Sequence, residues 1–154
     1  MKIRLVAVGK PRDAEAVALH DRYADRIRKL GVTYDADWVA EVRAGGRYSD
    51  DHVREREARL LADKLDERGT TIALDRRGRS FSSEAISGRL ERWSTPRATF
   101  VIGGPLGLAP SALDLADESW CLSELTLPHE LARVVLAEQL YRAFTLLRGI
   151  PYHK

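Results

Sequence analysis

The chain has 154 residues, of which 44% are hydrophobic and 31% are charged, and its formal net charge is +2. This length suits one domain with a proper core, and the composition excludes a disordered or fibrous protein. The apolar start of the chain is too short for a signal peptide and no run reaches transmembrane length, so we expect a cytoplasmic protein without a membrane partner. The single cysteine, Cys121, allows no internal disulfide and is expected to be buried as a small hydrophobic residue.

The first half of the chain alternates strand and helix patterns. Lys2 to Gly9 is a short, nearly continuous apolar run that predicts a buried strand, and the spacing of apolar residues predicts a helix from Asp13 to Leu30. A weaker strand follows within residues 32–42. A polar loop at 43–50, whose role is open, leads to a second helix pattern at 51–68.

The second half continues the same alternation. Strands are predicted at 71–75, 98–102 and 120–123, and helices from Ser82 or Ser83 to Trp93, at 110–116 and at 130–147. Strands that alternate with helices imply an α/β fold, with a mainly parallel sheet covered by helices on both faces. Because no linker or repeat interrupts the pattern, we expect a single domain over residues 1–154.

The segment from Arg76 to Arg97 is basic. It holds six arginines against two glutamates, and three of these arginines, Arg76, Arg77 and Arg79, lie in a predicted turn at 76–80. The next thirty residues, 98–127, carry four acids and no base. A polyanion would bind the basic segment, although arginines on a solvated surface explain the pattern equally well.

A glycine-rich turn, residues 103–107, follows the strand at 98–102. Parallel α/β folds bind ligands at the carboxyl ends of their strands, where glycine lets a ligand approach the backbone. The turn is neither G-x-G-x-x-G nor a Walker A loop, so a small-molecule Rossmann enzyme is the weakest interpretation. Taken alone, such a sequence is more often a simple tight turn.

The segment from Leu122 to Leu127 precedes Pro128 and alternates apolar and polar residues without a helix or hairpin pattern. Its free amides and carbonyls could read an adenine edge, and its leucines together with Leu74 would supply apolar walls. An ordinary edge strand is the alternative. No Cys or His spacing suits a metal, and no serine lies in a nucleophile elbow, so we assign neither a metal nor a hydrolytic nucleophile.

The final helix pattern carries more apolar residues than packing on one sheet face requires. This surplus indicates a subunit contact, most simply a twofold homodimer, although deep burial in its own domain is equally compatible with the pattern. The chain then ends on Tyr152, His153 and Lys154, which places a ring, an imidazole and an ammonium beside the terminal carboxylate. Most C-terminal tails are simply mobile, so the tail alone does not identify a site.

Together the motifs resemble those of ribosomal RNA large-subunit methyltransferase H, a family of the SPOUT superfamily. They are Thr71–Asp75, Phe100–Gly107, Leu122–His129, Arg133–Phe144 and Tyr152–Lys154. The resemblance runs from the first strand to the last residue. It implies a trefoil knot near the C-terminus, a homodimer, S-adenosylmethionine as cofactor, and methylation of N3 of a pseudouridine in the 23S rRNA of the large ribosomal subunit.

The resemblance also assigns candidate site residues. Those matching cofactor-contacting positions are Leu74, Gly103, Leu122, Ser123, Glu124, Leu125, Thr126 and Leu127. Methyl transfer to an imide N3 requires alignment of the base, removal of its proton and stabilisation of the developing anion. We expect His153 to act as the base and Arg142 to stabilise the anion, with Tyr152 stacking on the target base and Lys154 holding a phosphate. The tail of one subunit is expected to complete the cofactor pocket of the other.

Two further interpretations stay open. One is a catalytically silent RNA-binding dimer that keeps the fold, and the other is a knotted methyltransferase acting on tRNA or on a ribose oxygen, against which the short Tyr-His-Lys ending argues. The sequence also leaves open whether free rRNA, the subunit or the assembled ribosome is the substrate.

Overall fold

A single parallel sheet forms the centre of the molecule. The computed structural model describes residues 1–43, 45, 48–65 and 68–154, and in this part of the chain five strands pair in the order β2-β1-β4-β3-β5. All of the strand pairs are parallel, which confirms the predicted sheet. The strands are β1 (Lys2–Val8), β2 (Thr33–Val39), β3 (Thr70–Ser80), β4 (Ala98–Ile102) and β5 (Glu118–Cys121).

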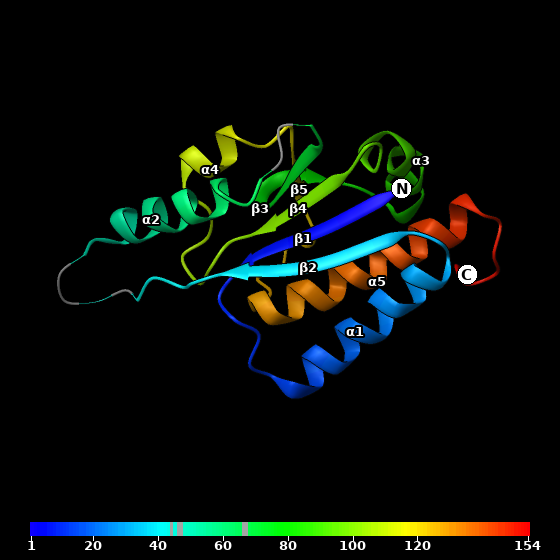
Figure 1. Cartoon of the computed structure of the whole chain (residues 1–154), viewed down its shortest axis with the longest axis horizontal. Helices are drawn as coiled ribbons and strands as arrows, with labels where there is room; N and C mark the ends of the chain where they lie inside the picture. The colour runs from blue at the N-terminus through cyan, green and yellow to red at the C-terminus, as the bar shows by residue number, and fades with distance from the viewer. Residues whose placement is uncertain (44, 46–47, 66–67) are drawn as a thin grey trace.

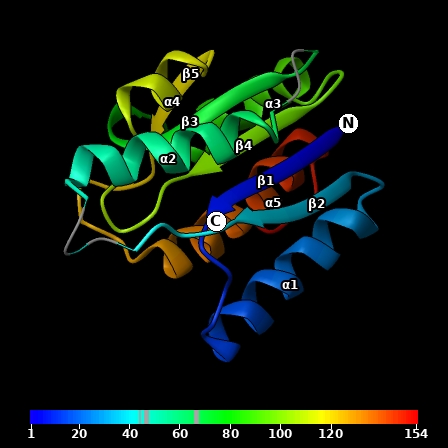
Figure 2. The same ribbon diagram turned by 60° about the vertical axis from the view of Figure 1, so that its left-hand side comes forward.

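Helices cover both faces of this sheet (Figures 1 and 2). On one face α1 (Ala14–Lys29) and α3 (Ser83–Trp93) both pack against α5 (His129–Leu147), and on the other face α2 (Asp50–Ala62) contacts α4 (Pro110–Asp114). The predicted α/β architecture is therefore confirmed. Within the described residues, no helix is long and apolar enough to cross a membrane.

Two hydrophobic clusters hold the layers together, one on each face of the sheet. The larger cluster, beneath α1, α3 and α5, contains Trp93, Phe100 and Trp120, whose ring centroids lie 6.0 to 6.4 Å apart. Aromatic pairs at such separations add to the stabilisation that burial gives. This packing holds the end of α3 against β4 and β5, and Cys121 at the end of β5 is buried as predicted.

Local signals set several element boundaries as the sequence predicts. Ser82, rather than Ser83, caps α3 by accepting a hydrogen bond from the amide of Ala85, and Asp13 caps α1 in the same way through the amide of Ala16. Helix α2 ends at Ala62, earlier than the predicted 68, and residues 66 and 67 of that prediction lie outside the described residues. The predicted polar loop at 43–50 also lies partly outside them.

The prediction of a turn at 76–80 is wrong, because β3 continues through Ser80. Its pairing with β5 contains a bulge. Leu74 and Arg79 both lie opposite Trp120, so residues 75–78 bulge out of the register between the two strands. Gly78 makes this possible, since a Cβ there would lie 2.8 Å from backbone atoms of Trp120. The three arginines are thus displayed on a strand extension and not on a free turn.

Candidate functional site

A cavity of about 460 Å³ opens where the carboxyl ends of β3 and β4 meet the chain that leaves β5. The strand arrows in Figure 1 point to this edge of the sheet, which is where parallel α/β folds bind their ligands. The residues that line the cavity are Leu74, Ile102, Gly103, Gly104, Pro105, Gly107, Thr126, Leu127, Pro128, His129 and Ala132. The site therefore joins three separate parts of the chain, namely the end of β3, the turn after β4 and the segment that leads into α5.

The glycine turn forms the floor of this cavity. The amide of Gly107 donates a hydrogen bond to the carbonyl of Gly104 at 2.9 Å, and Gly107 has a φ of +79°, which favours glycine. A Cβ on Gly103 would lie 2.8 Å from the carbonyl carbon of Gly107 and 2.9 Å from the amide nitrogen of Leu108. The turn can fold back on itself only because Gly103 has no side chain.

A second cavity, of about 490 Å³, adjoins the first and shares Leu74, Thr126 and Leu127 with it. It extends to basic side chains, namely Arg54, Arg76 and Arg77, and to Asp75. Asp75 accepts hydrogen bonds from the amide and the Nε of Arg77, at 2.9 and 3.2 Å. The mouth beside the glycine turn is therefore positively charged, which suits an anionic polymer.

The predicted cofactor residues fall into two groups. Leu74, Gly103, Thr126 and Leu127 line the cavity, whereas Leu122, Ser123, Glu124 and Leu125 do not. Leu122 packs against the core, Glu124 is exposed, and the hydroxyl of Ser123 accepts a hydrogen bond from the amide of Leu125 at 3.0 Å. The side chain of Leu125 is 77% exposed. Residues 122–127 form bends and not the edge strand considered as an alternative.

Sequence reasoning missed three residues at this site. His129 and Ala132, in the first turn of α5, line the cavity, and Glu57 lies buried behind the glycine turn. Its Oε1 accepts a hydrogen bond from the amide of Val42 at 2.9 Å, and burial raises the pKa of its carboxyl group. The sequence did contain a signal for the burial of Glu57. This acid lies at helical spacing between Val53 and Leu61, on the apolar face of α2.

Two of the predicted catalytic residues, Arg142 and Tyr152, meet at Glu138. The carboxylate of Glu138 accepts hydrogen bonds from Arg142 Nη2 at 2.6 Å and from the hydroxyl of Tyr152 at 3.1 Å. The hydrogen bond to Glu138 raises the pKa of Arg142, and burial together with hydrogen bonds raises the pKa of Tyr152. The guanidinium also lies over the Tyr152 ring, 4.8 Å from its centroid. Arg142 is thus charged and held in place.

The other two predicted catalytic residues end the chain. His153 Nε2 lies 3.0 Å from Oε1 of Glu84, at the start of α3, while Lys154 is exposed. His153 Nδ1 is buried and has no hydrogen-bond partner among the described residues. The tail therefore folds against its own subunit through Tyr152 and His153.

In Figure 1 the tail follows the last turn of α5, whereas residues of the first turn of this helix line the cavity. His129, at the first residue of the helix, lines the cavity, and Leu147 is the last of its 19 residues. At 1.5 Å per residue the helix is about 28 Å long. In one subunit the four predicted catalytic residues therefore do not come together with the predicted cofactor residues.

Comparison with known proteins identifies the class to which this fold and cavity belong. A family model described as a predicted SPOUT methyltransferase matches residues 1–153. A solved structure described as a probable methylase family protein from Haemophilus influenzae Rd KW20 shares the fold, with a TM-score of 0.58 at 14% identity over 99% of this chain and 70% of that chain.

Curated relatives narrow this class to one family. Proteins named ribosomal RNA large subunit methyltransferase H from Anaeromyxobacter sp. (strain Fw109-5) and from Thioalkalivibrio sulfidiphilus (strain HL-EbGR7) are 42% and 38% identical to this chain. The matches cover 100% of this chain and 100% and 99% of the two relatives. The chain therefore belongs to the ribosomal RNA large subunit methyltransferase H family of SPOUT methyltransferases.

Proposed function

We propose that this protein transfers a methyl group from S-adenosylmethionine to N3 of a pseudouridine in the 23S rRNA of the large ribosomal subunit. The observation that carries the proposal is the 460 Å³ cavity at the carboxyl edge of the sheet, built on the glycine turn. The names of the full-length relatives, which identify them as large-subunit rRNA methyltransferases, support the substrate class.

The cavity fits the proposed cofactor in size and chemistry. Leu74 and Leu127 offer apolar surface to a flat adenine ring, and the backbone of the glycine turn offers amides and carbonyls to its polar edge. The first turn of α5 borders the same cavity, and its free amides suit the carboxylate of the methionine part. We propose that the remaining members of the segment, Leu122 to Leu125, reach the cofactor only when the exposed Leu125 turns inward.

The bound cofactor supplies an electrophilic methyl group, so the work of the protein is to position the target base and manage its proton. In our proposal His153 accepts the N3 proton, and Arg142 stabilises the negative charge that develops on the imide. Tyr152 stacks on the base and Lys154 binds a phosphate. The ion pair with Glu138 holds Arg142 beside Tyr152.

We propose that the active unit is a homodimer in which the tail of one subunit completes the cavity of the other. The length of α5 supports this, because the chain's own tail lies a full helix away from its own cavity. Two α5 helices packed antiparallel would bring each tail to the opposite cavity. The exposed Leu131 on the first turns of α5 provides apolar surface for such a contact. We also propose that the C-terminal part of the chain forms a trefoil knot, as its membership of the SPOUT methyltransferases implies.

The basic strand extension supplies the proposed grip on RNA. Arg76, Arg77 and Arg79 are exposed on the bulged part of β3, and the first two line the cavity next to the glycine turn. Guanidinium groups bind the phosphate backbone without reading its sequence. We propose that they hold the rRNA so that the target base enters from this side.

Mixing two variants that are each impaired in a different part of the site tests this proposal. A chain that ends at Pro151 should keep its own cavity residues but lose turnover, and Gly103→Ala should keep the tail but damage the cavity. When the two proteins are mixed and allowed to exchange subunits, heterodimers contain one intact site, so methyl transfer to 23S rRNA should rise above the level of either variant alone. A mixture that gains no activity although heterodimers form would show that the tail acts within its own chain. Full turnover by the truncated chain alone would refute the role of the tail.

A further inference from the structure

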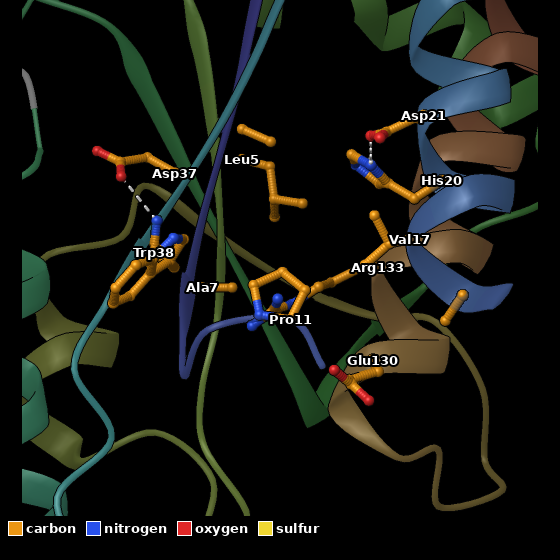
Figure 3. A pocket seen from close by; sticks show the side chains of 12 residues that line it. Leu5, Ala7, Pro11, Val17, His20, Asp21, Asp37, Trp38, Glu130 and Arg133 are labelled. Carbon is orange, nitrogen blue, oxygen red and sulfur yellow. Dashed lines mark hydrogen bonds and ion pairs between the residues drawn. The ribbon is translucent and has the colours of Figure 1, made fainter. Parts of the chain in front are cut away.

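The start of α5 lies between two cavities. His129 and Ala132 line the proposed cofactor cavity, whereas Glu130 and Arg133 line a second cavity of about 200 Å³, which α1, β1 and β2 enclose with the start of α5 (Figure 3). None of the four residues of the first turn is fully buried, and the N-cap position is a proline, whose side chain cannot accept a hydrogen bond from the turn. Apolar packing and capping therefore do little to fix this turn.

Arg133 ties the start of α5 to the end of β1. Its side chain is only 5% exposed, and its Nη2 donates hydrogen bonds to the backbone carbonyls of Val8, at 2.9 Å, and Gly9. Figure 3 shows this side chain reaching from α5 toward Pro11, in the segment that follows β1. Both bonds are charge-assisted, and such bonds are about twice as strong as bonds between neutral groups. One nitrogen thus holds the helix against a central strand of the sheet.

Glu130 ties the same turn to the residues that follow β1. Its carboxylate accepts hydrogen bonds from the amides of Arg12 and Asp13, the second at 3.2 Å. These bonds lower the pKa of the carboxyl group, so it is ionised at neutral pH. Asp13 is also the N-cap residue of α1, so the contact joins the starts of two helices. Together Glu130 and Arg133 form a clamp, the α5 clamp, on residues 8–13.

His129 connects the α5 clamp to the cofactor cavity. Gly9 has a φ of +84°, and a Cβ there would lie 3.8 Å from Nε2 of His129. The imidazole therefore lies beside the glycine whose carbonyl accepts a hydrogen bond from Arg133. A shift of the first turn of α5 relative to the end of β1 would move a side chain that lines the cofactor cavity.

We propose that Glu130 and Arg133 are positioning residues for methyl transfer, because they hold in place the wall of the cofactor cavity that the start of α5 supplies. The inference rests on the proposed function, in which this turn binds the methionine part of S-adenosylmethionine. Neither side chain lines the cofactor cavity, so both act through the turn that they hold. Cofactor affinity, and not the chemistry at the target base, should therefore depend on the α5 clamp.

Steady-state kinetics of the full-length protein tests this inference at Arg133. Arg133→Met removes the donors but keeps a long side chain, and Arg133→Lys keeps one charged donor. The KM for S-adenosylmethionine should rise about tenfold or more in Arg133→Met and less in Arg133→Lys, while kcat stays within about twofold of its value in the unaltered protein. The two constants separate because saturating cofactor fills the cavity and restores the position of the turn.

Ile27→Val is the control for a loss of stability alone. Ile27 is 0% exposed in the core beneath α1, and its truncation should lower the melting temperature without touching the α5 clamp. The KM for S-adenosylmethionine should stay unchanged in this variant. A purely structural role of Arg133 would likewise lower the melting temperature and the fraction of folded protein but leave this KM unchanged.

Glu130 provides an independent test that leaves the core undisturbed. Glu130→Ala removes the acceptors for the amides of Arg12 and Asp13, whereas Glu130→Gln keeps an oxygen that can accept from them. Calorimetry with S-adenosylhomocysteine should show an affinity about threefold or more lower in Glu130→Ala, and close to that of the unaltered protein in Glu130→Gln. Equal losses in the two variants would show that the charge of Glu130, and not its hydrogen bonds, matters, and would contradict its part in the α5 clamp.

The outcomes separate this inference from the proposed function. An unchanged KM in Arg133→Met together with an unchanged affinity in Glu130→Ala would overturn the α5 clamp even if the protein methylates 23S rRNA. A rise in KM that Ile27→Val reproduces would also overturn it, because lost stability would then explain the effect. If Arg133→Met does not fold, the two Glu130 variants decide. Failure of the unaltered protein to bind S-adenosylhomocysteine would instead overturn the proposed function.

Discussion

Gly103→Ala is the most informative single substitution in the proposed cofactor cavity. The new methyl group would lie 2.8 Å from the carbonyl carbon of Gly107 and 2.9 Å from the amide nitrogen of Leu108. Both contacts are backbone atoms of the same turn, so no side chain can move aside. Overpacking of this kind costs about 1 to 3 kcal/mol. The turn that lines the cavity must shift, and each 1.4 kcal/mol lost from binding weakens affinity about tenfold.

Calorimetry with S-adenosylmethionine should therefore show an affinity at least about tenfold lower for Gly103→Ala, together with a lower melting temperature. Gly88→Ala is the matched control. It lies inside α3, and a Cβ there meets nothing within 4 Å, so alanine should stabilise the protein by up to about 1 kcal/mol and leave cofactor binding unchanged. Unaltered affinity in Gly103→Ala would refute the assignment of the glycine turn to the cofactor.

Three other predictions concern stability and RNA binding. Because burial raises the pKa of Glu57, its proton is held to higher pH in the folded state, so the free energy of unfolding should fall as pH rises through the carboxyl range. The free energy of unfolding of Glu57→Gln should not fall in this way. If chemical denaturation gives parallel pH profiles of stability for the two proteins, this prediction is wrong. Phe144→Ala removes a ring that is 0% exposed and should cost about 3 to 5 kcal/mol in the same assay; a loss below 1 kcal/mol would contradict its place in the core. Arg76→Ala and Arg77→Ala should each reduce the slope of log affinity for 23S rRNA against log salt concentration, by about the amount that one phosphate contact contributes. An unchanged slope would show that the substituted arginine is not part of the RNA interface.

The fold was largely predictable because its signals are local. Continuous apolar runs marked β1 and β4 as buried parallel strands, and Ser82 stood at the start of a helix pattern that ends at Trp93. Such features depend on residues close together in the chain. The family resemblance added the predicted cofactor segment, residues 122–127, of which Thr126 and Leu127 line the cavity.

The features that were missed depend on contacts between distant segments. The bulge in β3 exists because Gly78 packs on the backbone of Trp120, which sequence spacing does not reveal. Glu57 is buried because the amide of Val42, fifteen residues earlier, satisfies its carboxylate. Arg133 belongs to a family motif, but its role at the carboxyl end of β1 became visible only when Val8 was placed beside it. Each of these features therefore depends on a contact between strands or layers that the spacing of residues along the chain does not reveal.

Mass spectrometry of 23S rRNA tests the central claim most directly. Large subunits, assembled ribosomes and free rRNA from cells that lack the endogenous modification are incubated with the purified protein and isotopically labelled S-adenosylmethionine. The proposed function predicts one labelled methyl group, on N3 of a pseudouridine, in at least one of these substrates. Label on a ribose oxygen or on another base, or no transfer by a protein that binds the labelled donor, would contradict it.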